Sequence, residues 1–235
     1  MTNADLIREL RKCRNADLSD GMDAIGLVNV GSMSTAMRPI RPGIEFKGFA
    51  YTVKLLPKYD NVKACRTLDE WREELGRGCR DIYSFTAGVN EETAKDMVIV
   101  VDMDGIAGGL WGSDIGLQMK TLGVSGVVID GGCRDVYETN LEGAEVFCTR
   151  RTFNHVYGRV TAGGVNVPIS CAGVTVRPGD VVCADDDGVL VIPRERAEEV
   201  LMFAMAQLTD DEAARAKKYE KAGYAADETL SRSKG

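Results

Sequence analysis

The sequence predicts an α/β protein with a parallel β-α-β unit at its centre and a small β-rich layer. Two apolar runs, 97–101 and 127–129, are rich in β-branched residues, which is typical of strands buried on both faces. Between them, residues 113–122 mix apolar residues with good helix formers, and Gly123 follows where a helix would end in a left-handed cap. A strand, a helix and a strand in this order are expected to cross over right-handed into a parallel pair. Residues 158–193 alternate short β-rich runs with turns, which predicts a barrel-like or sandwich-like layer.

The amino-terminal half is expected to supply two helices and one strand. Apolar residues at helical spacing predict a helix over 4–13, and a second short helix over 17–26 ends at a glycine. Apolar residues at every second position predict a strand over 46–55. Residues 58–74 are more polar and irregular, and we interpret them as an insertion or lid in which a helix opens near Thr67.

The carboxyl-terminal part is expected to be helical. Apolar positions predict a helix over 194–208, and Thr209 with the acidic residues after it would cap another helix. We expect residues 227–235 to fray. The organisation predicted is one domain over residues 1–208, followed by a C-terminal helix and tail over 209–235.

Charge and length exclude several classes of partner. The 235 residues include 29 basic and 36 acidic side chains, giving a net charge of −7, and no run of Lys and Arg is longer than Lys217-Lys218. This balance disfavours binding to nucleic acid or to an anionic membrane. No apolar stretch approaches about 18 residues, and the chain does not open with a charged segment followed by an apolar one. We therefore predict a soluble, cytoplasmic protein with no membrane partner.

The cysteine and histidine content narrows the chemistry. The seven cysteines include no C-x-x-C pair, which favours reduced, structural thiols. For Cys133, a small buried side chain is the preferred interpretation. His155 is the only histidine, which excludes zinc sites built from two or three imidazoles. Because no nucleophile motif accompanies His155, we expect a loop residue near a ligand or an ordinary surface residue rather than a catalytic base.

The second central strand should deliver a polar tip, Asp130 to Asp135, at its carboxyl end, where ligands bind in open α/β sheets. Arg134 offers a planar fork of donors that matches a carboxylate or a phosphate. Asp135 offers hard oxygen ligands suited to Mg²⁺ or Mn²⁺. The alternative is that Arg134 forms a structural ion pair with Asp135 or Asp130.

A second group of anion-directed features precedes this strand. Gly108-Gly109 and Gly112 let the backbone approach a ligand closely, and the N–H groups that open the next helix favour an anion. After one helix crossover these groups and Arg134 should converge. The predicted substrate-binding residues are Gly112, Ser113, Asp114, Ile115 and Arg134.

Several segments together resemble one family, the RraA-like proteins. This family includes RraA (regulator of ribonuclease activity A), the class II 4-hydroxy-4-methyl-2-oxoglutarate and 4-carboxy-4-hydroxy-2-oxoadipate aldolases, and members once described as demethylmenaquinone methyltransferases. A single short motif could not imitate the ordered set, which spans roughly residues 15–205. The matching segments are 18–23 with 25–26, 38–40, 48–53, 123–135, 176–180 and 184–193.

The resemblance implies a compact α/β/α swivelling domain that assembles as a homotrimer or as a homohexamer made of two trimers, with sites at subunit interfaces. In the aldolase branch of the family, the Asp that follows the Arg holds a divalent metal, largely through water. Carried over to this chain, Asp135 is the ligand of Mg²⁺ or Mn²⁺. Arg134 is the group that binds the carboxylate and enolate, and the amides of Asp114 and Ile115 form an anion nest. Arg134 and Asp135 are the catalytic residues that the resemblance implies.

One departure, one implied carboxylate and one retained pair bear on the activity. Ser113 occupies a position where the aldolases usually have an acidic residue, and Asp114 comes one place later. A carboxylate from a neighbouring subunit is also implied, for which Glu198 or Glu199 is our candidate. RraA itself lacks the Asp after its Arg, so retention of both residues favours an enzyme.

The function implied by the resemblance is that of a divalent-metal-dependent lyase acting on a small 2-oxo acid. The reaction would be retro-aldol cleavage of a 4-hydroxy-2-oxo acid to give pyruvate, decarboxylation of oxaloacetate, or both. In either reaction a metal and a guanidinium would stabilise the pyruvate enolate. The alternative is a non-catalytic protein of the RraA type that binds and regulates a ribonuclease.

Overall fold

The parallel β-α-β unit expected at the centre of the chain is present in the computed structural model, which describes residues 1–60 and 62–234. It consists of β3 (Met97–Asp102), α4 (Ser113–Leu122) and β5 (Gly126–Cys133). β3 and β5 pair in parallel, and Val98 faces Gly126 in the register. The predicted helix cap is also confirmed, because Gly123 ends α4 in the left-handed conformation with φ 97°.

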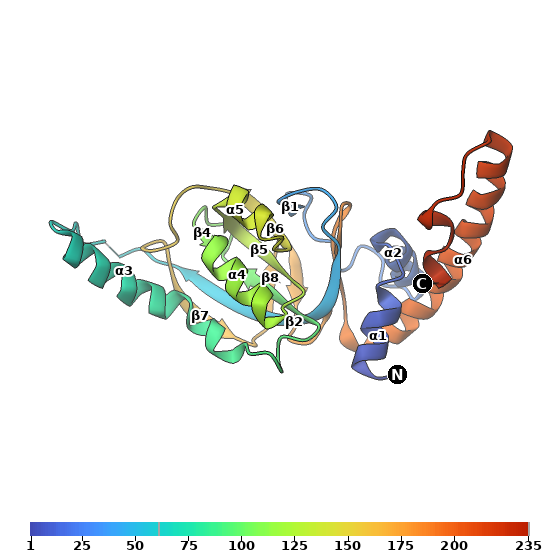
Figure 1. Cartoon of the computed structure of the whole chain (residues 1–235). Coiled ribbons are helices and arrows are strands. Elements are labelled where there is room, and N and C mark those ends of the chain that lie inside the picture. The colour runs from blue at the N-terminus through green and yellow to red at the C-terminus, as the bar shows by residue number, and fades with distance from the viewer. Residues whose placement is uncertain (61, 235) are drawn as a thin grey trace.

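One large mixed sheet forms the centre of the molecule (Figure 1). Its parallel part contains β2 (Phe46–Pro57), β3, β5 and β6 (Val146–Arg151). Shorter strands complete it: β1 (Arg38–Pro39), β4 (Gly109–Trp111), β7 (Val160–Val165), β10 (Val181–Asp185) and β11 (Gly188–Ile192). The predicted α/β class with a parallel centre is thereby confirmed.

The β-rich segment after residue 158 divides between two sheets. β8 (Ile169–Cys171) and β9 (Val174–Val176) pair only with each other and form a two-stranded hairpin. β7, β10 and β11 instead extend the main sheet, since β7 and β10 both pair with β2. This placement follows from the length of β2, which is long enough to accept two partners at different positions along one edge.

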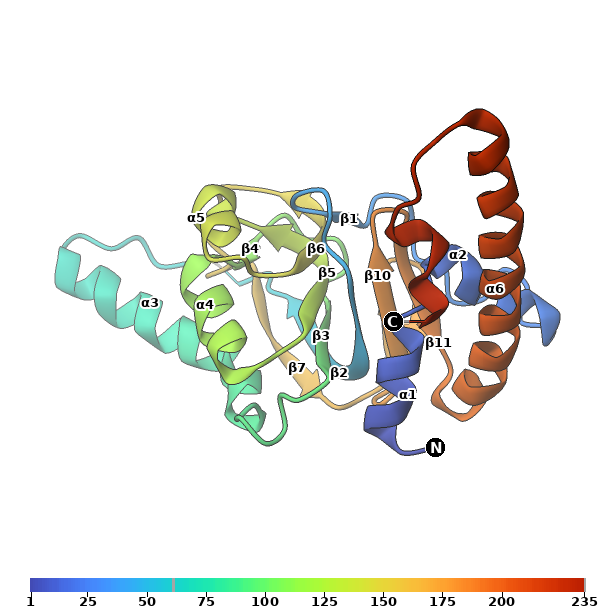
Figure 2. The ribbon, with the colours of Figure 1, turned by 45° about the vertical axis from the view of Figure 1, so that its right-hand side comes forward.

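The β10–β11 hairpin separates two hydrophobic cores. Its alternating side chains face opposite ways, so Val182 and Val191 join the main core while Val181 and Ile192 join a second one. The second core is closed by three helices (Figure 2): α1 (Asn3–Leu10), α2 (Asn15–Ala24) and α6 (Ala197–Ala222).

The segment interpreted as an insertion or lid contains a helix, α3 (Leu68–Ile82), followed by a 3-10 turn over Ser84–Gly88. Thr67 caps α3 as predicted, with its hydroxyl accepting a hydrogen bond from the amide of Glu70 at 3.2 Å. Most of α3 is exposed, and the helix projects away from the sheet (Figure 1). Whether α3 moves as a lid stays a prediction.

The break predicted between two C-terminal helices is wrong, because α6 runs without interruption from Ala197 to Ala222. The hydroxyl of Thr209 donates to the carbonyl of Met205 one turn earlier at 2.8 Å. It therefore does not cap a new helix. The division into a domain over 1–208 and a C-terminal part over 209–235 stays a prediction.

The frayed tail predicted over 227–235 is also wrong for the part of it that the structure describes. Short 3-10 turns over Glu228–Leu230 and Arg232–Lys234 fold back onto α6. The amide of Ser233 donates to Glu212 at 2.8 Å, which gives that buried carboxylate a partner.

The predicted polar tip, Asp130 to Asp135, does not begin where the strand ends. β5 continues to Cys133, so Asp130 lies inside the strand rather than in a loop. Asp130 accepts hydrogen bonds from the amide of Ala172 at 2.9 Å and the hydroxyl of Thr149 at 3.2 Å, which makes it a structural anchor. The short helix α5 (Val136–Leu141), which the sequence did not predict, begins directly after Asp135.

Among the described residues, no helix is both long and apolar enough to cross a membrane.

Candidate functional site

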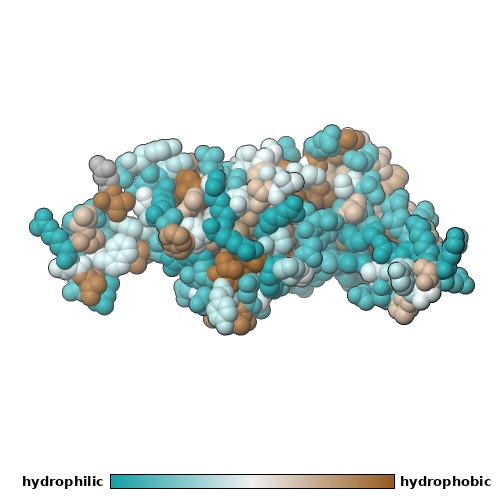
Figure 3. Space-filling model, turned by 90° about the horizontal axis from the view of Figure 1, so that it is seen from above, coloured by the Kyte–Doolittle hydropathy of each residue, from teal (hydrophilic) through white to brown (hydrophobic). Residues whose placement is uncertain are grey.

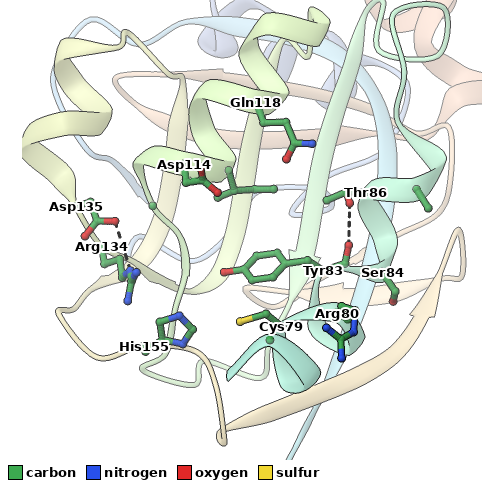
Figure 4. A pocket seen from close by; sticks show the side chains of 14 residues that line it. Cys79, Arg80, Tyr83, Ser84, Thr86, Asp114, Gln118, Arg134, Asp135 and His155 are labelled. Atoms are coloured by element: carbon green, nitrogen blue, oxygen red, sulfur yellow. Dashed lines mark hydrogen bonds and ion pairs between the residues drawn. The ribbon is translucent and has the colours of Figure 1, made fainter. Parts of the chain in front are cut away.

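A pocket with a volume of about 600 Å³ lies beside the amino-terminal end of α4 (Figure 4). Its wall comes from three parts of the chain: α3 with the turn after it, the start of α4, and the loops after β5 and β6. The lining residues are Gly76, Cys79, Arg80, Tyr83, Ser84, Thr86, Ala87, Gly112, Asp114, Ile115, Gln118, Arg134, Asp135 and His155.

Backbone geometry aims Arg134 and Asp135 at this pocket. The amide of Arg134 donates to the carbonyl of Trp111 at 2.8 Å, which ties the end of β5 to the strand before α4. Asp135 occupies the position before α5 in a left-handed conformation, φ 51° and ψ 40°, and its side chain makes no capping hydrogen bond. An Asp tolerates this conformation better than most residues because its side chain is short and polar.

The two side chains form a loose ion pair, with 3.4 Å between Arg134 Nε and Asp135 Oδ2. Charge-assisted hydrogen bonds are usually about 2.7–2.9 Å long, so this contact leaves both groups able to bind a ligand. The side chains are 31% and 37% exposed. Of the two ion pairs considered from the sequence, the one between Arg134 and Asp135 is present. Asp130 instead accepts hydrogen bonds from Ala172 and Thr149.

Two glycines make room for this pair. A Cβ at Gly112 would lie 2.5 Å from Asp135 Oδ2, and a Cβ at Gly109 would lie 2.9 Å from the Arg134 side chain. A Cβ at Gly109 would also lie 2.9 Å from the backbone carbonyl of Asn154, so glycine is needed at that position, whereas a Cβ at Gly112 would force the Asp135 carboxylate to move.

The start of α4 presents unsatisfied amides to the same pocket. Gly112 is the cap residue and has no side chain to satisfy them, and the first helical bond runs from Gly116 N to Gly112 O at 3.0 Å. Gly112, Asp114 and Ile115 line the pocket together with Arg134 and Asp135, as the predicted convergence requires. Ser113 begins the helix but is not among the lining residues.

The segment interpreted as an insertion or lid does contribute to the pocket through the end of α3, but sequence reasoning did not single out Arg80 there. Arg80 lines the pocket and forms no ion pair with any residue in the part of the chain that the structure describes. The available signal for packing against α3 was Gly78, because a glycine inside a helix costs about 1 kcal/mol relative to Ala and so indicates a close approach. A Cβ at Gly78 would in fact lie 2.5 Å from the ring of Tyr157.

Tyr83 joins this wall to the start of α4. Its hydroxyl donates to the carbonyl of Leu110 at 2.7 Å, and burial raises the pKa of the phenol above its ordinary value. Tyr83 is therefore a neutral donor at physiological pH that fixes the α3 wall against the β4–α4 segment.

His155 lies in a loop and lines the pocket, which is the first of its two predicted placements. Burial lowers the pKa of the imidazole, and the nearby guanidinium groups of Arg134 and Arg159 lower it further, while Asp135 acts in the opposite direction.

Cys133 has the small, buried side chain that the sequence favoured. A hydrogen bond with Cys148 is the largest cause that raises the pKa of the Cys133 thiol, and burial adds to it. A thiol held protonated in this way is a poor nucleophile.

The residues present fit a largely hydrated metal ion. In residues 1–60 and 62–234, no three His, Cys, Asp or Glu side chains cluster closely enough to enclose one. Mg²⁺ usually keeps several waters and takes only one or two protein carboxylates, a requirement that Asp135 can meet, with Asp114 in the same pocket. Glu198 and Glu199 instead pair with the amino terminus and Arg196, on the α6 side of the molecule.

Fold and pocket together define an α/β protein with a candidate ligand pocket at the carboxyl end of a parallel sheet. Comparison with known proteins agrees, since the family model RraA-like, described as Aldolase/RraA, matches residues 15–191. The chain therefore belongs to the RraA-like family, as its motifs indicated.

Two relatives and one solved structure illustrate the range of the family. Protein DlpA of Legionella pneumophila is 32% identical over 212 residues; the match covers 89% of this chain but only 31% of DlpA. A Halalkalibacterium halodurans protein named "Putative 4-hydroxy-4-methyl-2-oxoglutarate aldolase" is 32% identical over 210 residues, with 89% of this chain and 86% of that protein covered. The crystal structure of Streptomyces coelicolor RraAS2, titled an unusual member of the RNase ES inhibitor RraA protein family, has a TM-score of 0.73. It is 24% identical and covers 92% of this chain and all of that one, which shows a shared fold.

Proposed function

We propose that this protein is a divalent-metal-dependent lyase that cleaves a carbon–carbon bond in a small 2-oxo acid. The observation that carries the proposal is the meeting of Arg134, Asp135 and the open start of α4 in one pocket. The activity would be retro-aldol cleavage of a 4-hydroxy-2-oxo acid to give pyruvate, decarboxylation of oxaloacetate, or both. The name of the Halalkalibacterium halodurans relative supports a substrate of this class.

Arg134 and the first amides of α4 would bind the 2-oxo carboxylate. The guanidinium offers a planar fork of donors, and the unsatisfied amides around Asp114 and Ile115 carry the positive end of the helix dipole. The amides belong to the backbone of α4, and the backbone of Arg134 is held to Trp111 while the stem of its side chain packs against Gly109.

Both reactions place the same demand on the site. When the bond between C3 and C4 breaks, its electron pair passes into a pyruvate enolate, and a proton added at C3 completes pyruvate. The C4 fragment leaves as CO2 from oxaloacetate; in retro-aldol cleavage the C4 hydroxyl loses its proton to water and C4 leaves as the carbonyl carbon of the second product. Arg134 would stabilise the negative charge that develops on the enolate oxygen. A Mg²⁺ or Mn²⁺ ion held through Asp135 and water would supply Lewis acidity toward that same charge.

Arg80 is suited to hold the other end of the substrate. In Figure 4, Arg80 and Arg134 lie on opposite sides of the pocket, with Tyr83 and Cys79 between them. Oxaloacetate and 4-hydroxy-4-methyl-2-oxoglutarate both carry a second carboxylate, and an unpaired guanidinium would bind it. Substrates with two carboxylates are therefore the ones to test first.

The deciding experiment follows pyruvate formation from oxaloacetate and from 4-hydroxy-4-methyl-2-oxoglutarate. Purified protein is assayed with Mg²⁺, with Mn²⁺, and after treatment with EDTA. We expect turnover with either metal and its loss in EDTA, restored by an excess of metal. An Asp135→Asn variant carried through the same purification controls for contaminating lyases. Substrate incubated with metal but without protein controls for spontaneous decarboxylation.

Absence of turnover with every 2-oxo acid tested would contradict the proposal. If the same protein then formed a stable complex with a purified ribonuclease and inhibited it, the regulatory alternative would take its place.

A further inference from the structure

The loop that carries His155 is held rigidly against the pocket. The amide of Gly109 donates to the carbonyl of Asn154 at 2.9 Å, and Arg159 Nη1 donates to the carbonyl of His155 at 2.6 Å. The ring of Tyr157 packs over Gly78 and makes an edge contact with Trp71, at 5.6 Å between ring centroids. The imidazole is thus positioned by β4 on one side and by α3 on the other.

One hydrogen bond determines which ring nitrogen carries the proton. The backbone amide of Tyr157 donates to Nδ1 of His155 at 2.9 Å. Because an amide can only donate, Nδ1 must present its lone pair, and the proton of the neutral ring must be on Nε2. Protonation of Nδ1 would break this bond, so the geometry itself favours the neutral imidazole.

The charges around the ring act in the same direction. Arg134, Arg159 and Asp135 are the charged groups that affect His155, and the two guanidinium groups oppose a third positive charge. Because Nδ1 is turned to its own loop, Nε2 lies on the opposite edge of the ring and is left free to bind a ligand. His155 lines the pocket near Arg134 (Figure 4).

We propose that His155 is a catalytic hydrogen-bond donor whose Nε2–H binds the oxygen that gains negative charge in the 2-oxo acid, beside Arg134. The inference rests on the proposed lyase function and adds a residue to it. A neutral imidazole cannot protonate carbon at a useful rate, but it can stabilise an oxyanion as a preorganised dipole. Its role is therefore to bind the enolate oxygen and not to transfer a proton.

A direct test uses nuclear magnetic resonance of the imidazole nitrogens. His155 is the only histidine, so a ¹⁵N-labelled sample gives one pair of ring signals that need no assignment. We expect the pattern of a neutral ring protonated at Nε2 at neutral pH. Addition of oxalate, a mimic of the pyruvate enolate, with Mg²⁺ should shift the Nε2 signal more than the Nδ1 signal.

Two variants with amide side chains distinguish the two roles of His155: Nε2–H as a donor to the ligand, and Nδ1 as the acceptor that holds the loop. In His155→Asn the side-chain oxygen can still accept the hydrogen bond from Tyr157 N–H, but no donor reaches the pocket. In His155→Gln the amide nitrogen lies close to the position of Nε2 and can donate. We expect kcat to fall roughly 10²-fold in His155→Asn, with Tm unchanged, and to recover substantially in His155→Gln.

The outcomes distinguish this inference from the function on which it rests. A ring protonated at Nδ1, a doubly protonated ring at neutral pH, or a fully active His155→Asn would overturn the role of His155 while leaving a lyase in place. An oxalate-induced shift at Nε2 in a protein that turns over no 2-oxo acid would instead remove the lyase and retain His155 as a donor to a bound carboxylate.

Discussion

Gly112 and Asp135 are in contact across the gap between two loops: a Cβ on Gly112 would lie only 2.5 Å from Oδ2 of Asp135. The backbone of Gly112 is extended, with φ −137° and ψ −172°, so an L residue could adopt it without strain. What requires glycine here is the carboxylate opposite it. The position of Asp135, the proposed metal ligand, therefore depends on a residue 23 places earlier in the sequence.

Gly112→Ala should consequently displace the Asp135 carboxylate while the fold remains intact. We expect a loss of roughly 10²-fold in kcat with Mg²⁺, because a misplaced electrostatic group loses most of its effect, and a weaker apparent affinity for the metal. Steady-state kinetics over a range of Mg²⁺ concentrations measures both. Gly164→Ala is the control, since its Cβ would meet nothing closer than 3.3 Å. Equal metal dependence in the two variants would argue against this contact.

Changes to the Arg134–Asp135 pair should abolish activity without unfolding the protein. Asp135→Asn is the suitable variant because Asn tolerates φ 51° and the native side chain makes no capping bond to lose. Arg134→Lys should fail as well, since an ammonium cannot reproduce the two-pronged contact. We expect each to lower kcat/KM by about 10²–10³-fold with Tm near that of the wild type. If both variants lost activity only in proportion to their unfolded fraction, the pair would be a structural ion pair.

Arg80→Gln should discriminate between substrates. If Arg80 binds the second carboxylate, KM for oxaloacetate should rise by roughly tenfold or more while kcat changes less, because the contact is present in both ground and transition states. Arg72→Gln is the matched control on the same helix; Arg72 is exposed, and its one ion pair among the described residues is with Asp69 at 3.2 Å. An unchanged KM in Arg80→Gln would show that the second carboxylate binds elsewhere.

The stability of the protein should depend on His155 in mildly acidic solution. Burial and the neighbouring Arg134 and Arg159 lower the pKa of His155 in the folded state below its ordinary 6.5, against the smaller opposing effect of Asp135. As the pH falls below 6.5, the unfolded chain takes up a proton before the folded chain does. The preference of the folded protein for a neutral His155 therefore contributes fully to stability above the pKa of His155 in the unfolded chain. The contribution is lost as the pH falls below that value. We expect Tm to drop less in His155→Asn than in the wild type between about pH 7.5 and about pH 5.

The protein should be a trimer or a hexamer in solution. The proposed metal site has few carboxylates within one chain, and Glu198 and Glu199 are on the α6 side of the molecule, so only a neighbouring subunit could bring them to a pocket. Leu68 and Trp71 on the projecting α3 are 70% and 40% exposed, and hydrophobic side chains are visible at that end of the surface in Figure 3. Light scattering at micromolar concentration measures the assembly directly. A monomer that retains full activity would exclude a site shared between subunits.

The sequence by itself determined the centre of this protein. Strand 97–101, helix 113–122 and the following strand were predictable because unbroken β-branched runs and a helix ending at Gly123 leave few alternatives in a right-handed crossover. The same crossover explains why Arg134 could be expected beside the start of α4. The ordered set of motifs was sufficient to indicate the RraA-like family, which the match over residues 15–191 confirms.

Only the tertiary structure determined the remaining features of the pocket and the course of the C-terminal helix. Most of the contacts that fix them join residues far apart in the chain. Nothing in the sequence singles out Arg80; it lines the pocket because α3 packs against the loop that contains Tyr157. The tautomer of His155 depends on an amide two residues later, and its access to the pocket depends on Gly109 in another strand. Thr209 was interpreted as a helix cap because its type suits one, but in α6 its hydroxyl bonds to the carbonyl of Met205 one turn earlier, and Glu212 is buried against the tail at Ser233. Local sequence preferences amount to a few tenths of a kcal/mol to about 1 kcal/mol per residue, and burial of a helix face in a core outweighs them.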